Sequence, residues 1–238
     1  MRALLIANTG DADAGYVGSR FADFDFEFRH LPREYPAQWP TLDGIDLVLL
    51  LGSEWSVYWG DVSKGVAAEH GLIRETHRRG IPLFGICFGA QMIASALGGS
   101  AERAKKCEIG WHEVVTTPTY SVLAGLWLQW HCDTFTPPAG AEVLAFSDAG
   151  PQALRIGRSF ATQFHPEANE AIVTRWMGGP GAAELATQGI VPSTLIEQTR
   201  NEVIRSGPAA ARVVDWFLHN VANTPMPKVD GSSRPKSK

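Results

Sequence analysis

Two short stretches carry residue types that together could perform nucleophilic chemistry. Cys87 lies between Gly85 and Gly89, and His165 is followed two residues later by Glu167. A cysteine nucleophile needs a base, and histidine is the usual one. A carboxylate behind the histidine fixes its tautomer and stabilises the imidazolium. The set therefore predicts a Cys-His-Glu triad, while each stretch alone also fits a structural role, as a buried cysteine or a surface turn.

The stretch around Cys87 predicts a buried strand, a sharp turn and the start of a helix. Residues 81–86 form an apolar run, and from Phe88 the apolar residues recur at helical spacing. A cysteine at such a turn projects from the carboxyl edge of the sheet, and flanking glycines allow strained backbone and close approach of a substrate. The positive helix end favours the thiolate, and its free N–H groups can hold an oxyanion.

The stretch His165-Pro166-Glu167 predicts a base and its orienting carboxylate on one side of the chain. Proline pushes the residue before it into an extended conformation. Side chains two residues apart in extended chain point to the same side. We therefore expect His165 and Glu167 to lie together.

Length and composition indicate one α/β domain. The chain has 238 residues, 45% of them hydrophobic, with a formal charge of −4. This charge gives no reason to expect a nucleic-acid or membrane partner. No signal peptide or transmembrane run is predicted, so we expect a cytoplasmic protein.

The three cysteines are odd in number and far apart, so we expect neither a disulfide framework nor a metal site. A reducing compartment is the simpler interpretation, and it suits a thiolate mechanism. Cys107 precedes a strand and is predicted to be structural. Cys132 is not expected to be a second nucleophile, because the neighbouring His131 would point to the opposite face of a strand.

Strands alternate with helices in the first half of the chain, which predicts a parallel sheet covered on both sides. Ligands in such folds bind beyond the carboxyl ends of the strands, where Gly52-Ser53 and Cys87 should lie. The predicted elements are strands at 3–7, 26–31, 46–51 and 81–86, and helices at 16–24, 66–79 and 88–97.

The second half is predicted to be richer in strands and to end in helices. We expect a turn at 131–133, between strands at 108–115, 126–130, 142–146, 153–156 and 160–164. Helices are expected at 170–176, at 182–205 with an interruption near Pro192, and at 208–221. The domain would span residues 1–222, and residues 223–238 would be a disordered tail because they combine prolines and lysines with little apolar content.

Three stretches in this order resemble the motifs of class I glutamine amidotransferases: Leu51-Gly52-Ser53, Gly85–Gln91 and Gln163–Glu167. Residues 130–133 and 137–140 look like the amidotransferase domain of GMP synthetases. The resemblance implies a three-layer flavodoxin-like α/β fold, with a mainly parallel central sheet and helices on both faces.

By this resemblance, Cys87 would attack the γ-amide of glutamine, with His165 as base and Glu167 orienting it. The backbone of Ser53 and Phe88 would form the oxyanion hole. The substrate-binding residues would be Gly52, Gln91, Cys132 and Asp133. No cofactor or metal is implied.

Two departures from the family pattern concern this pocket. The family's Gly-Gly-Pro-x-Ser-Val-Tyr stands here as residues 52–58, with Ser53, Glu54 and Trp55 replacing family residues, and Cys132 stands where a glycine is common. The Ser53 amide can serve only if its backbone suits a non-glycine residue. Glu54 and Trp55 could alter the accepted leaving group, or could be an exposed loop end with a packed indole.

Three functions follow from the resemblance. The first is a glutaminase that releases ammonia to a separate synthetase or acceptor subunit, since the chain has no room for an ATP-binding synthetase domain. The second is a stand-alone γ-glutamyl peptidase or hydrolase with the same triad. The third is a catalytically silent regulatory homologue, which the intact Cys87, His165 and Glu167 disfavour.

Overall fold

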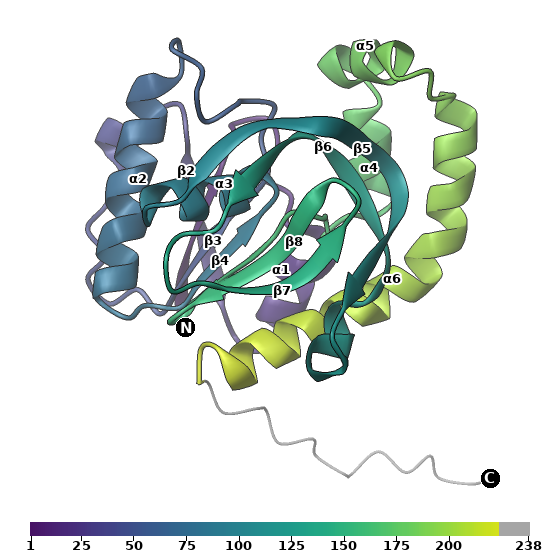
Figure 1. The fold of residues 1–238 in the computed structure, drawn as a ribbon. Coiled ribbons are helices and arrows are strands. Elements are labelled where there is room, and N and C mark those ends of the chain that lie inside the picture. The colour runs from purple at the N-terminus through teal and green to yellow at the C-terminus, as the bar shows by residue number, and fades with distance from the viewer. Residues whose placement is uncertain (224–238) are drawn as a thin grey trace, which may run out of the picture.

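A nine-stranded sheet organises the part of the chain that the computed structural model describes, residues 1–223. The strand order is β2-β1-β3-β4-β9-β8-β7-β5-β6 (Figure 1). The strands are β1 Arg2–Ala7, β2 Glu27–Pro32, β3 Leu47–Leu50, β4 Leu83–Ile86, β5 Ser100–Thr116, β6 Gly125–Thr136, β7 Glu142–Ser147, β8 Gly150–Ile156 and β9 Ser159–Thr162.

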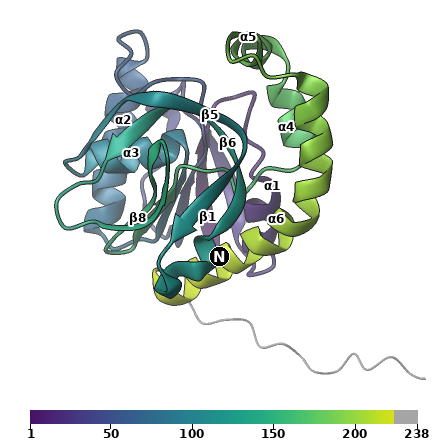
Figure 2. The same ribbon diagram turned by 45° about the vertical axis from the view of Figure 1, so that its right-hand side comes forward.

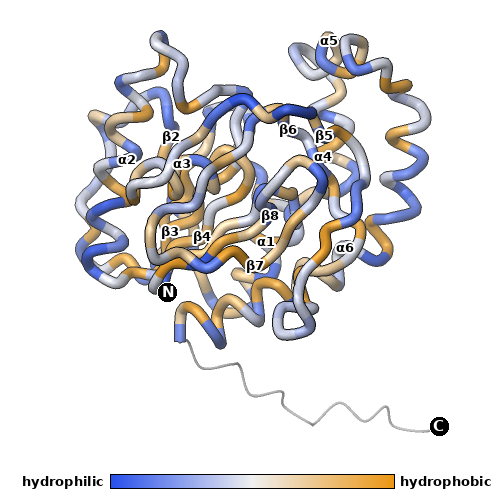
Figure 3. Tube along the Cα trace, in the orientation of Figure 1, coloured by the Kyte–Doolittle hydropathy of each residue, from blue (hydrophilic) through white to orange (hydrophobic). Residues whose placement is uncertain are grey.

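The five strands from β2 to β9 in that order pair in parallel, and the ladders beyond β9 are antiparallel. Every residue of β3, β4 and β9 is buried. Parallel strands covered on both faces are expected to be apolar throughout, and the centre of the sheet is accordingly hydrophobic (Figure 3). The predicted first five strands are all present.

Helices cover both faces of the sheet, which gives the three layers predicted (Figures 1 and 2). On one face, α1 and α6 pack against alternate residues of β1 and β3; on the other, α2 and α3 pack against the residues between them. The helices are α1 Gly15–Ala22, α2 Ser63–Arg78, α3 Phe88–Ala96, α4 Glu170–Trp176, α5 Gly179–Thr187 and α6 Pro192–Asn220, with short 3₁₀ turns η1 Pro36–Gln38 and η2 Pro118–Leu123.

Two predictions about the second half were wrong. Residues 131–133 are not a turn but the middle of β6, because β5 pairs with it, Arg103 opposite Asp133 and Glu108 opposite His131. The helix predicted to break before Pro208 continues through it as α6. Proline removes one hydrogen bond, and the helix changes direction along its course (Figure 1).

Helix α6 nevertheless packs against the sheet, because its buried residues belong to the same hydrophobic core as β1, β3 and α1. An added Cβ on Gly207 would lie 3.1 Å from the ring of Tyr16 in α1, so α6 approaches α1 closely at this point. The predicted interruption near Pro192 is confirmed, since α5 ends before it and α6 begins at it. Residues 224–238 of the predicted tail lie outside the described residues. Within residues 1–223, no helix has the length and apolar character needed to cross a bilayer.

Candidate active site

A cavity of about 810 Å³ lies beyond the carboxyl ends of the parallel strands. Residues that follow four neighbouring strands line it: Asn8 after β1, Gly52 after β3, Cys87 after β4 and His165 after β9. This is the edge at which α/β sheets bind ligands. The sheet therefore brings the two sequence stretches, 78 positions apart by their numbers 87 and 165, to one cavity.

Cys87 occupies the sharp turn between β4 and α3. Its backbone has φ 53° and ψ −106°, a left-handed conformation that an L residue adopts only under strain. Its amide donates to the Thr162 carbonyl at 2.8 Å, and its own carbonyl accepts from the amides of Ala90 and Gln91. These bonds hold the strained turn, and Cys87, which lines the cavity, is 5% exposed as a residue.

The flanking glycines are needed for backbone packing. A Cβ on Gly85 would lie 2.7 Å from the Gly89 carbonyl oxygen, and a Cβ on Gly89 would lie 2.5 Å from the Leu50 carbonyl oxygen. Both residues therefore let α3 approach the sheet closely. This is a different use from the substrate approach that the sequence suggested.

His165 and Glu167 lie in contact, as predicted. The Nδ1 atom of His165 is 2.7 Å from Oε1 of Glu167, and both side chains are buried. They meet across a turn, closed by the Ala168 amide on the His165 carbonyl, rather than along the extended chain that we expected. Trp176 of α4 packs edge-on against the imidazole at 4.7 Å.

The charges around His165 favour its protonated form. Burial opposes the imidazolium, but the negative charges of Glu167 and Cys87 outweigh it and raise the pKa of His165 to about 10. Because Nδ1 is engaged by Glu167, Nε2 is the ring nitrogen left for the thiol. Within residues 1–223, no nitrogen or oxygen bonds Nε2, which is buried.

The two residues whose amides are predicted to form an oxyanion hole, Ser53 and Phe88, line the cavity together with Cys87. Phe88 is the first residue of α3, whose amide has no acceptor within the helix. Within the described chain, the non-glycine residues with positive φ are Asp25, Cys87 and Asn223, so the Ser53 backbone suits an L side chain. Neither amide donates a loop or turn hydrogen bond in residues 1–223.

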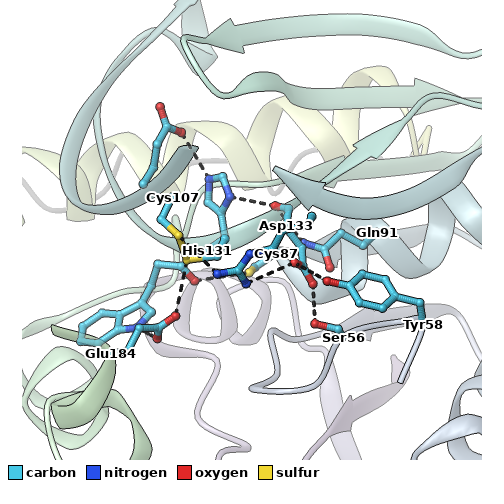
Figure 4. The surroundings of a disulfide bond; sticks show 12 residues. Ser56, Tyr58, Cys87, Gln91, Cys107, His131, Asp133 and Glu184 are labelled. Atoms are coloured by element: carbon cyan, nitrogen blue, oxygen red, sulfur yellow. Dashed lines mark hydrogen bonds and ion pairs between the residues drawn. A yellow bond between two sulfur atoms is a disulfide. The ribbon is translucent and has the colours of Figure 1, made fainter. Parts of the chain in front are cut away.

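The loop after β3 is tied to β6 through Asp133. Its carboxylate accepts from the hydroxyls of Ser56 at 2.5 Å and Tyr58 at 2.9 Å (Figure 4). Gln91 is buried, and its amide nitrogen donates to the Asp133 carbonyl and to Oε1 of Gln163. Gln163 in turn lies 3.5 Å from Sγ of Cys87. The predicted residues Gln91 and Asp133 therefore share one buried network behind the thiol.

Cys132 and Cys107 form a disulfide between β6 and β5 (Figure 4). This corrects the expectation that the cysteines would not pair. Their distance in sequence was misleading because the antiparallel ladder places the two residues on facing strands. Cys87 is the free cysteine of the described chain. Cys132 lines the cavity.

Glu184 lines the cavity but was not singled out in the sequence, whereas Glu54 and Trp55 were. Glu184 of α5 accepts from the Trp130 indole at 2.8 Å and reaches the wall of the cavity next to Cys132. Glu54 is exposed at the rim, and the Trp55 indole packs on Gly65 of α2. Glu184 lies in a stretch that was predicted to be helical, but nothing in the local pattern placed that helix beside the cavity.

The sheet order and the buried thiol, imidazole and carboxylate define an α/β protein with a cysteine-centred site. The sequence model for the class I glutamine amidotransferase family matches residues 21–172. This chain therefore belongs to the class I glutamine amidotransferase family. The predicted family and the flavodoxin-like fold are both confirmed.

Curated relatives include the GMP synthase of Aeropyrum pernix, which is 31% identical over an alignment of 169 residues; the match covers 66% of this chain and 32% of that protein. The GMP synthase of Thermus thermophilus is 40% identical over an alignment of 98 residues; the match covers 37% of this chain and 19% of that protein. The chain thus spans about a third or less of these relatives. Among solved structures, a glutamine amidotransferase of Thermotoga maritima has a TM-score of 0.82 and 27% identity, covering 92% of this chain and 98% of that one.

Proposed function

We propose that this chain is a glutaminase that hydrolyses the γ-amide of glutamine through a thioester on Cys87. The observation that carries the proposal is the strained free cysteine at one cavity with a buried His165–Glu167 pair, 2.7 Å apart. Family membership supports glutamine as the substrate class.

In the first half of the reaction, the Cys87 thiolate attacks the γ-carbonyl carbon, and the carbonyl oxygen becomes an oxyanion. Imidazolium at His165 gives its Nε2 proton to the departing nitrogen, so the C–N bond breaks and ammonia leaves. The His165 pKa of about 10 keeps this proton available at neutral pH. Glu167 fixes the tautomer and stabilises the imidazolium.

In the second half, neutral His165 takes a proton from water, which attacks the thioester carbonyl and releases glutamate. The Cys87 thiolate and His165 imidazolium are restored. The amides of Ser53 and Phe88 would donate to the oxyanion in both halves, since both residues line the cavity with Cys87 and neither amide has a competing loop partner within residues 1–223.

The glutamyl moiety binds through Gly52 and the backbone of Cys132 and Asp133, which line the cavity with Cys87. Gln91 lines it too, and supports the same wall through its hydrogen bond to the Asp133 carbonyl. The ammonia would pass to a synthetase or other acceptor active site, as the name of the Aeropyrum pernix relative, a glutamine-hydrolysing GMP synthase, suggests.

One observation favours a γ-glutamyl peptidase as the second candidate. The cavity of about 810 Å³ lies at the upper end of the range for drug-sized ligands, roughly 300–1,000 Å³, and extends from Cys87 to Pro180 and Glu184 of α5. A γ-glutamyl compound with a longer leaving group would fill more of it than glutamine does.

Product analysis tests both candidates. Purified protein is incubated with glutamine and, separately, with γ-glutamyl dipeptides, with Cys87→Ala as the control. Glutamate and ammonia from glutamine, lost in the variant, would support the glutaminase. Strong preference for a dipeptide would support the peptidase, and no turnover of any substrate would contradict both and favour the silent homologue.

A further inference from the structure

Arg33, just after β2, is fully buried beneath the loop that follows β3. Arginine has five N–H donors, and five acceptors surround this one. They are the two carboxylate oxygens of Glu69 at 2.8 and 3.3 Å, Oδ1 of Asn8 at 2.8 Å, and the carbonyl oxygens of Leu51 and Gly52, each at 3.1 Å.

The Arg33–Glu69 pair is costly as a purely stabilising device. Both side chains are 0% exposed, so two charges have left water. Replacing such a pair by apolar residues of similar volume is often neutral or stabilising. Stability alone therefore does not account for a guanidinium at this place. The groups that it contacts beyond Glu69 offer another reason.

The first of these groups is the peptide unit that joins Gly52 to Ser53. In a planar trans peptide, the C=O and N–H bonds point in opposite directions, and no cis peptide occurs in the described chain. Because the Gly52 carbonyl points to Arg33, the Ser53 amide points away from it. Gly52 itself borders the site: a Cβ there would lie 3.2 Å from Cε1 of His165 and 3.6 Å from Cβ of Cys87.

Arg33 also touches the residue that carries the second amide. Its Cζ atom lies 4.7 Å from the ring centroid of Phe88, within cation–π range. Asn8 connects Arg33 to Ser53, since its Oδ1 accepts hydrogen bonds from the Arg33 guanidinium and, at 2.7 Å, from the hydroxyl of Ser53. One buried guanidinium thus contacts the supports of both amides.

We propose that Arg33, held by Glu69, is the positioning residue that sets the direction and spacing of the Ser53 and Phe88 amides in the oxyanion hole. It does not line the substrate cavity. This inference rests on the proposed thioester mechanism. It predicts that Arg33 matters for reactions that pass through an oxyanion and not for those that do not.

Two reactions of the same thiol separate these cases. Iodoacetamide alkylates Cys87 by substitution at a saturated carbon: the S–C bond forms, iodide leaves, and no oxyanion arises. With γ-glutamyl p-nitroanilide, an S–C bond forms at the γ-carbonyl, the C–N bond breaks, and p-nitroaniline leaves with the His165 proton. The second reaction alone needs the two amides.

The main variant is Arg33→Met/Glu69→Leu, which removes both buried charges together and leaves neither unpaired. We expect acylation to fall by about 10²–10³-fold, the effect of losing an oxyanion-hole donor, with the alkylation rate unchanged. The matched control is Arg20→Met/Asp215→Leu, a pair of 2.7 Å that joins α1 to α6, which should change neither rate.

Acylation at the wild-type rate, or an equal fall of both rates, would overturn the proposal. If the double variant does not fold, Arg33→Lys decides: it keeps the charge beside Glu69 with three donors instead of five. It should slow acylation selectively, and unchanged acylation would refute the inference. Should wild-type protein accept no γ-glutamyl compound, the proposed function fails, and p-nitrophenyl acetate then tests the positioning role, because its acyl transfer needs the amides but no glutamyl recognition.

Discussion

Replacing Glu167 with glutamine should shift the protonation of His165 far toward the neutral form. Burial opposes the charge on this imidazole, and the charges of Glu167 and Cys87 raise its pKa from 6.5 to about 10. At about 1.4 kcal/mol per pH unit, this corresponds to roughly 5 kcal/mol in favour of the imidazolium. Glutamine can keep an oxygen near Nδ1, which is 2.7 Å from Oε1 in the wild type, but it removes the charge that raises the pKa of His165 the most.

The sign of the effect on stability follows from the raised pKa. Protonated His165 stabilises the fold in full below pH 6.5, and this contribution is lost as the pH rises through about 10. The variant lacks most of it. The difference in free energy of unfolding between wild type and Glu167→Gln should therefore be largest below pH 6.5 and shrink toward pH 10.

Two measurements check this prediction. NMR titration of the His165 Cε1 proton should give a midpoint near 10 in wild type and one much nearer 6.5 in the variant, and urea denaturation at a series of pH values should give the difference in stability. The control is Glu170→Gln, which removes a carboxylate from a surface pair with Arg200. An unchanged His165 midpoint in Glu167→Gln would refute the reasoning.

Two further predictions concern the frame around the site. Cys107→Ala removes the bond to Cys132 and should lower the free energy of unfolding, measured by urea denaturation, by about 2–4 kcal/mol. A reductant should destabilise the wild type but not the variant. A wild type whose stability does not respond to reductant would contradict the disulfide. Gly89→Ala places a Cβ 2.5 Å from the Leu50 carbonyl oxygen and should lower the free energy of unfolding by about 1–3 kcal/mol. Gly71→Ala on α2, where an added Cβ has nothing within 4 Å, should leave the stability unchanged or raise it. Thermal melts compare the two variants, and equal effects would show that the close approach of Gly89 to Leu50 does not matter.

The parts of the site that local pattern encodes were predictable. A change from strand to helix period at Cys87, between two glycines, predicted the turn. Proximity of His165 and Glu167 was predicted correctly, but from an extended chain, whereas a turn closed by the Ala168 amide brings the two side chains together. The parallel half of the sheet was predictable as well, since strands such as β3 are buried on both faces and have a continuous apolar sequence.

Contacts between distant segments could not be predicted. Arg33 and Glu69 are 36 residues apart, and nothing in the local sequence around either indicates a buried pair. The Cys107–Cys132 bond depends on the register of β5 against β6. In β6, residues 131–133 were predicted to be a turn, because a polar stretch of this kind is typical of turns. Their buried partners, such as Glu108 on β5, cannot be recognised from the local sequence.

A γ-glutamyl thioester on Cys87 can be detected directly. Protein mixed with glutamine is quenched in acid, digested and analysed by mass spectrometry. The account predicts one glutamyl adduct on the peptide that contains Cys87, released as the hydroxamate by hydroxylamine and absent from Cys87→Ala. Glutamate and ammonia formed by Cys87→Ala at the wild-type rate, or an adduct on another residue, would contradict it.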